Sequence, residues 1–164
     1  MGKQYGRRLR LSPEEEALIQ NHRTTTNIGI IGDTHEPFCH PGYREFCYDV
    51  FNRFGCGEII HIGDEVDNAA LSYHESDVEM PNAVQEAEQA QKAMEKWYHL
   101  FPDVKVCVGN HSALPFRQAT TAGIPKRYLK TYEEIWNAPE GWKWQMEWEV
   151  DNVLYVHGTG SSGV

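Results

Sequence analysis

The chain has 164 residues, of which 40% are hydrophobic, 12% aromatic and 24% charged, a composition typical of one globular domain whose core needs no disulfide support. Its 15 basic and 24 acidic residues give a formal net charge of −9, which disfavours a protein that coats nucleic acid through Lys and Arg contacts to phosphates. No apolar run approaches the roughly 20 residues that span a membrane, and the basic N-terminus lacks the apolar stretch of a signal peptide, so we expect a cytoplasmic protein.

The predicted elements alternate between strands and helices. Residues 1–26 are expected to form a basic arm and a short helix that begins at a capping box, Ser12-Pro13-x-Glu15, while residues 27–164 form the main domain. Apolar runs predict strands over 27–32, from 58 onward and from 104 onward. Apolar residues at helical spacing predict helices within 43–54 and 84–97, and shorter helices are expected over 114–122 and 126–137.

The last predicted elements form a hairpin. The segment KWQMEWEV alternates as a single strand and turns at Asp151-Asn152 into a second strand, VLYVHG. Trp142, Trp144 and Trp148 have even spacing and are expected to share one face of that strand. The whole order, β-α-β-α-β followed by helices and a hairpin, predicts an α/β or layered α+β domain.

Glycine followed directly by Asp or Asn ends three of the apolar runs. These runs read IGIIGDTH, IIHIGDEVD and VKVCVGNH, and a fourth run, VLYVHG, ends at His157-Gly158. Glycine at a strand exit lets the backbone turn sharply or approach a ligand closely. Because strand exits meet at one edge of a sheet, the side chains that follow these glycines are expected to converge there.

The residues after these glycines are metal-ligand types. Asp33 and His35 are two residues apart and project to the same side if the strand geometry continues, Asp64 leaves the second strand at the equivalent point, and Asn110 and His111 leave the third. Mixed oxygen and nitrogen ligands favour manganese, iron or zinc over calcium. A carboxylate between two ligand groups suggests two cations about 3.5–4 Å apart, and a remaining imidazole would protonate the leaving oxygen. Each motif alone is also typical of a turn or helix cap, but the ordered set indicates a metal centre.

These motifs resemble those of the calcineurin-like metallophosphoesterase superfamily, most of all its small phage and bacterial members. The resemblance covers residues 27 to the end through Asp33-x-His35, Gly63-Asp64-x-x-Asp67-Asn68, Gly109-Asn110-His111 and His157-Gly158. It implies a four-layer α/β/β/α sandwich and a hydrolase that uses a hydroxide activated by two metal ions for in-line attack on a phosphomonoester or phosphodiester. The substrate class extends to nucleotides and nucleic acid.

The resemblance also implies a role for each site residue. Asp33 and His35 would bind the first metal ion, Asp64 would bridge both, and Asn110 and His157 would bind the second. His111 would be the catalytic imidazole. The two ions would be divalent, with manganese the first expectation and iron, zinc or nickel the alternatives.

The chain departs from the family pattern at two places. Family members follow Gly-Asn-His with Asp or Glu, whose carboxylate orients the catalytic imidazole, whereas this chain has Ser112. Family members also carry a Gly-His-x-His segment with one imidazole for each metal, and the residues after His157 read GTGSSGV. The expectation is therefore a fragment or a truncated member whose sandwich is incomplete at the C-terminus. The alternative function is a phosphoesterase-like module that binds metal weakly and serves in assembly or binding without catalysis.

Several other residues receive a structural interpretation. His61 is predicted to pack within the sheet, and His74 to lie in a solvated loop. The four cysteines have no metal-binding spacing and are expected to be reduced. The tryptophan face suggests self-association if the sandwich is incomplete, and the basic arm is expected to be a solvated tail. A doubly wound nucleotide-binding domain is ranked last because no Gly-rich phosphate loop is present.

Overall fold

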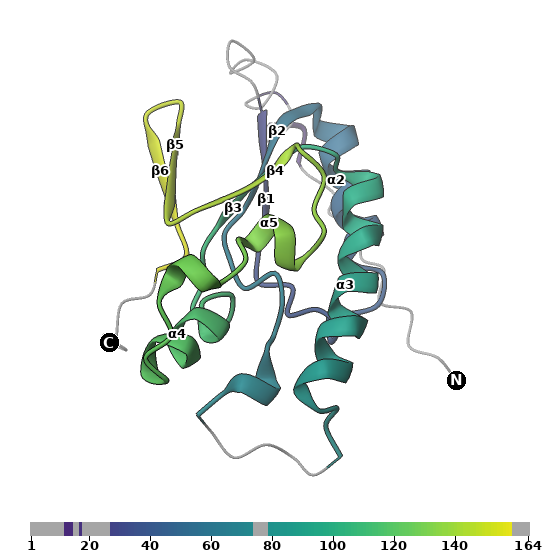
Figure 1. Ribbon diagram of the computed structural model, residues 1–164. Helices are drawn as coiled ribbons and strands as arrows, with labels where there is room; N and C mark the ends of the chain where they lie inside the picture. The colour runs from purple at the N-terminus through teal and green to yellow at the C-terminus, as the bar shows by residue number, and fades with distance from the viewer. Residues whose placement is uncertain (1–11, 15–16, 18–26, 74–78, 159–164) are drawn as a thin grey trace, which may run out of the picture.

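The computed structural model describes residues 12–14, 17, 27–73 and 79–158, and its centre is a parallel four-stranded sheet (Figure 1). The strands follow the chain in the order β1-β2-β3-β4. Their bounds are β1 (Asn27–Ile31), β2 (Cys56–His61), β3 (Val104–Cys107) and β4 (Trp142–Gln145). The predicted α/β class is confirmed. The helix expected after Ser12 lies mostly outside the described residues, and His74 lies outside them entirely.

Helices connect the strands, and the two longest of them cover one face of the sheet. They are α2 (Tyr43–Phe54), α3 (Ala83–Leu100), α4 (Leu114–Thr121) and α5 (Tyr132–Ile135), with 3-10 turns η1 (Ala69–Leu71) and η2 (Lys126–Tyr128). Parallel strands that follow the chain in spatial order, joined by right-handed crossovers, place successive helices on the same face. Figure 1 shows α2 and α3 on one side of the sheet and a two-stranded hairpin on the other.

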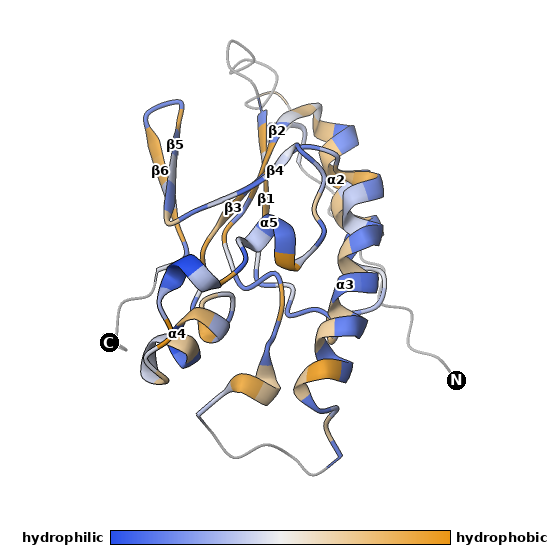
Figure 2. Cartoon of the chain, in the orientation of Figure 1, coloured by the Kyte–Doolittle hydropathy of each residue, from blue (hydrophilic) through white to orange (hydrophobic). Residues whose placement is uncertain are grey.

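Local sequence signals fix the ends of the two long helices. α2 ends at Gly55, whose φ of 60° is left-handed. α3 is capped by Asn82, whose side chain accepts from the amides of Val84 and Gln85, while the Gln85 side chain closes the capping box. Its buried side chains include Ala90, Met94 and Trp97, three or four residues apart. Figure 2 shows polar and apolar residues alternating along α3 and apolar residues concentrated on the central strands.

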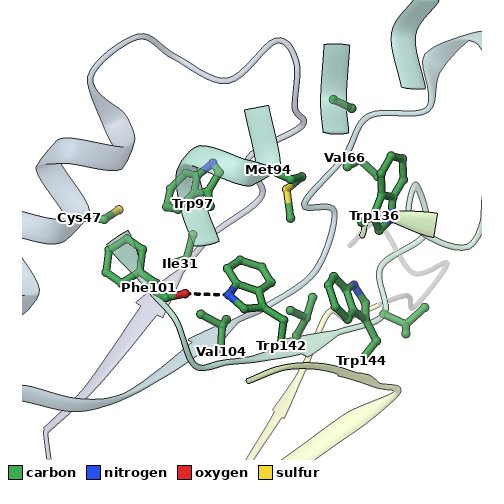
Figure 3. Packing of buried hydrophobic residues seen from close by; sticks show 13 residues of the cluster. Ile31, Cys47, Val66, Met94, Trp97, Phe101, Val104, Trp136, Trp142 and Trp144 are labelled. Atoms are coloured by element: carbon green, nitrogen blue, oxygen red, sulfur yellow. Dashed lines mark hydrogen bonds between the residues drawn. The ribbon is translucent and has the colours of Figure 1, made fainter. Parts of the chain in front are cut away.

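Aromatic side chains from α3 and β4 fill the core between the helices and the sheet (Figure 3). Trp142 is fully buried and donates its Nε1–H to the carbonyl of Phe101 at 2.7 Å. Trp97 donates to the buried carboxylate of Glu36 at 2.8 Å. The indole polar atoms are thus paired, which removes the cost of burying them.

The segment KWQMEWEV forms two strands in two sheets, so the prediction of a single strand is wrong. β4 pairs with β3 only as far as Cys107–Gln145, after which the chain bends at Met146. The following residues form β5 (Glu147–Val150), which pairs antiparallel with β6 (Val153–Val156). The expected turn at Asp151-Asn152 is confirmed, and both residues have positive φ, as a type I′ turn requires.

The three tryptophans consequently do not share one face. Trp142 and Trp144 are buried on the helical side, whereas Trp148 lies on β5 and donates its Nε1–H to Val106 O at 2.9 Å. The Nζ atom of Lys105 lies 5.8 Å from the centre of the Trp148 ring. Lys105 alternates with the core residues of β3, so the hairpin covers the face of the sheet opposite the helices.

The helix expected over 126–137 is also divided. Residues 126–128 form η2, Leu129 is extended, and Thr131 starts α5 with a capping box closed by Glu134. The Thr131-x-x-Glu134 spacing is a helix-start signal in its own right, and the helix begins there instead of at residue 126.

Two further observations bear on expectations from the sequence. All four cysteines are free, as expected. Within the described residues, no helix is both long enough and apolar enough to cross a membrane.

Candidate metal centre

Backbone hydrogen bonds join the loops that leave β1 and β2. The amides of Thr34 and His35 both donate to the carbonyl of Asp64, at 3.1 and 3.0 Å, and the amide of Glu36 donates to the carbonyl of Glu65 at 3.0 Å. The D-x-H and G-D motifs are therefore held side by side by main-chain contacts, which do not depend on the motif side chains.

The carboxylate of Asp64 then fixes the loop that leaves β3. Its Oδ1 accepts from the amides of His111, at 2.8 Å, and Ser112, at 3.4 Å. Asn68 donates from its side chain to the carbonyl of His111 at 3.0 Å. Because Oδ1 of Asp64 already accepts from two backbone amides, Oδ2 is the oxygen that is available to bind a metal ion.

Two glycines are required because side chains of the predicted site occupy the space where a Cβ atom would lie. A Cβ on Gly109 would collide with the Asp64 carboxylate and would lie 2.5 Å from the Asp64 amide nitrogen. A Cβ on Gly63, whose φ is +107°, would lie 2.6 Å from Nδ1 of His157. The glycines at the strand exits thus admit the close approach that the sequence pattern predicts.

Three residues of the motif loops hold a left-handed backbone without being glycine. They are His35, with φ of 47°, and Asp64 and Asn68, each with φ of 51°. This conformation costs about 1–2 kcal/mol for a residue that carries a Cβ atom. Such strain clusters at sites where side-chain direction matters, and here it affects two predicted metal ligands.

Asp33, Asp64 and His157 form one possible ligand group, in which one ligand atom from each residue lies within 4.8 Å of the others. The Nδ1 atom of His157 lies 2.8 Å from the carbonyl of Ile62 and therefore carries the ring proton in the neutral imidazole. Its Nε2 then presents a lone pair 2.8 Å from Oδ1 of Asn110 and 3.2 Å from Oδ2 of Asp64. Acceptor atoms that converge in this way fit a divalent cation.

His35, Asp67 and His111 form a second group under the same 4.8 Å criterion. Oδ1 of Asp67 lies 2.7 Å from Nδ1 of His35 and 3.2 Å from Nδ1 of His111. The carbonyl of Asp67 lies 2.5 Å from the same Nδ1 of His111. The two rings meet edge to face with centroids 4.7 Å apart. Asp67 thus orients two imidazoles and leaves Nε2 of His111 available for proton transfer.

The Ser112 hydroxyl donates its hydrogen bond to the buried carboxylate of Glu65 and not to the His111 ring. The distance from this hydroxyl to Oε2 of Glu65 is 2.6 Å, and Trp144 donates to Oε1 of the same residue at 3.0 Å. Glu65 is fully buried, and burial raises the pKa of its carboxyl above the ordinary value, against the opposing effect of these hydrogen bonds. The carboxylate that lies beside His111 in this structure is that of Asp67, at 3.2 Å from Nδ1.

His61 packs within the sheet, as predicted, and is 1% exposed. The amide of Gly63 donates to Nδ1 of His61 at 3.2 Å, so Nε2 carries the proton and donates to Oγ1 of Thr34 at 3.2 Å. Thr34 in turn donates to the carbonyl of Glu65. Burial lowers the pKa of His61 to about 3, with His157 and His35 adding to the effect.

The structure gathers the sequence-predicted residues at the carboxyl edge of the sheet in two groups. Asp33, Asp64, Asn110 and His157 lie together, while His35 and His111 lie with Asp67. Sequence reasoning did not assign a role to Asp67, although its place in the G-D-x-x-D motif was a signal. Nothing in the sequence indicated Glu65, because its partners lie on β4 and on the loop after β3.

Comparisons with known protein families, with curated proteins and with solved structures found no match to this chain.

Proposed function

We propose that the protein is a metal-dependent phosphoester hydrolase that holds two divalent cations at the carboxyl edge of the sheet. The observation that carries the proposal is the convergence of two ligand-capable groups on strand exits that are separated in sequence. Their oxygen and nitrogen donors suit manganese, iron, zinc or nickel. The resemblance noted in the motifs supports the same function and a four-layer sandwich as the complete architecture.

We assign as metal ligands the side-chain atoms that do not take part in the hydrogen bonds holding the loops together. Asp33, Oδ2 of Asp64, Oδ1 of Asn110 and Nε2 of His157 would hold one cation between them. His35 and Asp67 are the candidates nearest a second cation. When bound, such a pair of cations neutralises phosphate charge and makes hydroxide available near neutral pH.

The residues of the chain supply orientation and proton transfer. His111 is held at Nδ1 by the carbonyl and carboxylate of Asp67, so its ring is fixed before substrate arrives. We assign His111 to donate a proton from Nε2 to the leaving oxygen. Asp64 links the two strand-exit loops that carry these groups.

The test is hydrolysis of bis-p-nitrophenyl phosphate with Mn²⁺. The wild-type protein is expected to turn over, Asp64→Asn to lose activity, and His111→Ala and Asp67→Asn to lose about 10²–10⁴-fold, the usual contribution of a positioned acid. Asp49→Asn, which changes an exposed aspartate on α2, is the matched control.

Absence of metal-dependent turnover in the wild-type chain would overturn the enzymatic assignment. It would favour the alternative, a phosphoesterase-like module that binds metal weakly and acts in assembly or binding.

A further inference from the structure

A cavity of about 890 Å³ opens directly beside the candidate metal centre. Asn110 and Gly109, which belong to the third motif, are part of its lining. A second cavity of about 610 Å³ is lined by the residues that begin β2, β3 and β4 and thus lies at the opposite edge of the sheet. The first cavity is therefore the one placed to receive the organic part of a phosphoester bound at Asn110.

The walls of this cavity are aromatic. Phe116 and Tyr132 have ring centroids 4.7 Å apart, and Tyr132 stacks on Trp144 with an interplanar angle of 15°. Tyr73 also lines the cavity and is 56% exposed, and its hydroxyl lies 3.3 Å from Oγ1 of Thr121. Aromatic walls of this kind bind flat aromatic rings by stacking.

The charges of the lining are cationic although the chain as a whole carries −9. Within the described part of the chain, the charged side chains that line the cavity are Arg117 and Lys126. The guanidinium carbon of Arg117 lies 5.9 Å from the centre of the Tyr73 ring, which holds the cation against the wall. Cations placed beside aromatic faces suit a ligand that combines a planar ring with phosphate.

We propose that this cavity binds the nucleoside part of a nucleotide phosphoester whose phosphorus lies at the metal centre, an inference that rests on the proposed function. A cavity of this volume exceeds what inorganic phosphate or a small alkyl ester needs. A single-stranded polyanion binds along an extended positive groove. The two basic side chains of the lining, Arg117 and Lys126, on a chain of net charge −9, do not form such a groove. A mononucleotide ester is therefore the occupant that the lining favours.

The first experiment measures binding without catalysis. Thymidine 5′-monophosphate is titrated into the full chain in EDTA while tryptophan fluorescence is followed, because Trp144 lines the cavity. Binding is expected to quench the fluorescence and to weaken about tenfold in Arg117→Gln and in Tyr73→Leu, two exposed positions whose substitution leaves the core intact. Arg127→Gln, a neighbouring exposed cation outside the cavity, is the matched control and is expected to bind as the wild type does.

The second experiment separates this inference from the proposed function. With Mn²⁺, hydrolysis bonds a water oxygen to phosphorus and releases p-nitrophenolate from either thymidine 5′-(p-nitrophenyl phosphate) or methyl p-nitrophenyl phosphate. The thymidine ester is expected to have a kcat/KM about tenfold higher, and Arg117→Gln and Tyr73→Leu to reduce that ratio toward one.

Equal hydrolysis of both esters without nucleotide binding would overturn the cavity assignment while the hydrolase proposal stands. Hydrolysis of neither ester would overturn the hydrolase proposal. The fluorescence titration would still show whether the cavity binds a nucleotide. Much tighter binding of a short oligothymidylate than of the mononucleotide would overturn the mononucleotide assignment in favour of single-stranded nucleic acid.

Discussion

Replacement of Gly63 by alanine tests whether the strand-exit glycine exists to seat His157. The new Cβ atom would lie 2.6 Å from Nδ1 and 2.8 Å from Cγ of the His157 ring, so the ring must move. Movement breaks its contacts with Ile62 O and Asn110 Oδ1, both 2.8 Å. Gly42→Ala is the matched control, because Gly42 has φ of +86° with nothing within 4 Å of the added atom.

Both variants are expected to lose about 1–2 kcal/mol of unfolding free energy from the positive φ alone. Gly63→Ala should lose about 1–3 kcal/mol more, from overpacking and the broken hydrogen bond between Nδ1 of His157 and Ile62 O. Its affinity for Mn²⁺ should fall at least tenfold while that of Gly42→Ala is retained. Urea denaturation and calorimetric titration measure the two quantities. Equal stability and equal Mn²⁺ affinity in the two variants would refute the role assigned to Gly63 and His157.

Three further predictions concern buried polar groups and a helix cap. Burial in the folded protein lowers the pKa of His61 from its ordinary 6.5 to about 3. The neutral ring therefore makes its full contribution to the free energy of unfolding above pH 6.5, and that contribution is lost as the pH falls from 6.5 toward 3. At pH 4.5 the loss of unfolding free energy should reach about 3 kcal/mol. The loss should be absent from His61→Gln and kept in the exposed-histidine control His40→Gln, as urea denaturation at several pH values would show. Ser112→Ala removes the donor to the buried Glu65 carboxyl with little change in volume, and should cost about 1–3 kcal/mol; a loss under about 0.5 kcal/mol would contradict the network. Asn82→Ala deletes the α3 cap and should cost about 1 kcal/mol in the same assay, with no change in Mn²⁺ affinity; weakened Mn²⁺ binding would contradict a purely structural cap.

The sheet and the site edge could be predicted because their signals are local. The runs that end at Gly32, Gly63 and Gly109 predict strands by composition and strand exits by the glycine itself. Parallel pairing of those strands then brings the following residues to one edge. The division of KWQMEWEV could not be predicted, because alternation continues unchanged through Met146 while β4 loses its partner at the end of β3.

The grouping of the site side chains depends on contacts that no local pattern encodes. His35 and His111 lie together because Oδ1 of Asp67 is 2.7 Å from Nδ1 of His35 and 3.2 Å from Nδ1 of His111. The pairing of Ser112 with Glu65 similarly joins residues 47 positions apart. The capping box at Thr131 is the exception, because the Thr131-x-x-Glu134 spacing is a local signal that predicts the start of α5.

The central claim, a site for two divalent cations, is tested most directly by counting metal ions per chain. The protein is stripped with EDTA, reloaded with Mn²⁺, freed of unbound ions and analysed for metal content. We predict two manganese ions per wild-type chain and a loss of manganese in Asp64→Asn, because an amide nitrogen then replaces Oδ2, the ligand oxygen beside Asp33 and His157. A wild-type chain that retains no manganese, or retention that Asp64→Asn leaves unchanged, would contradict the account.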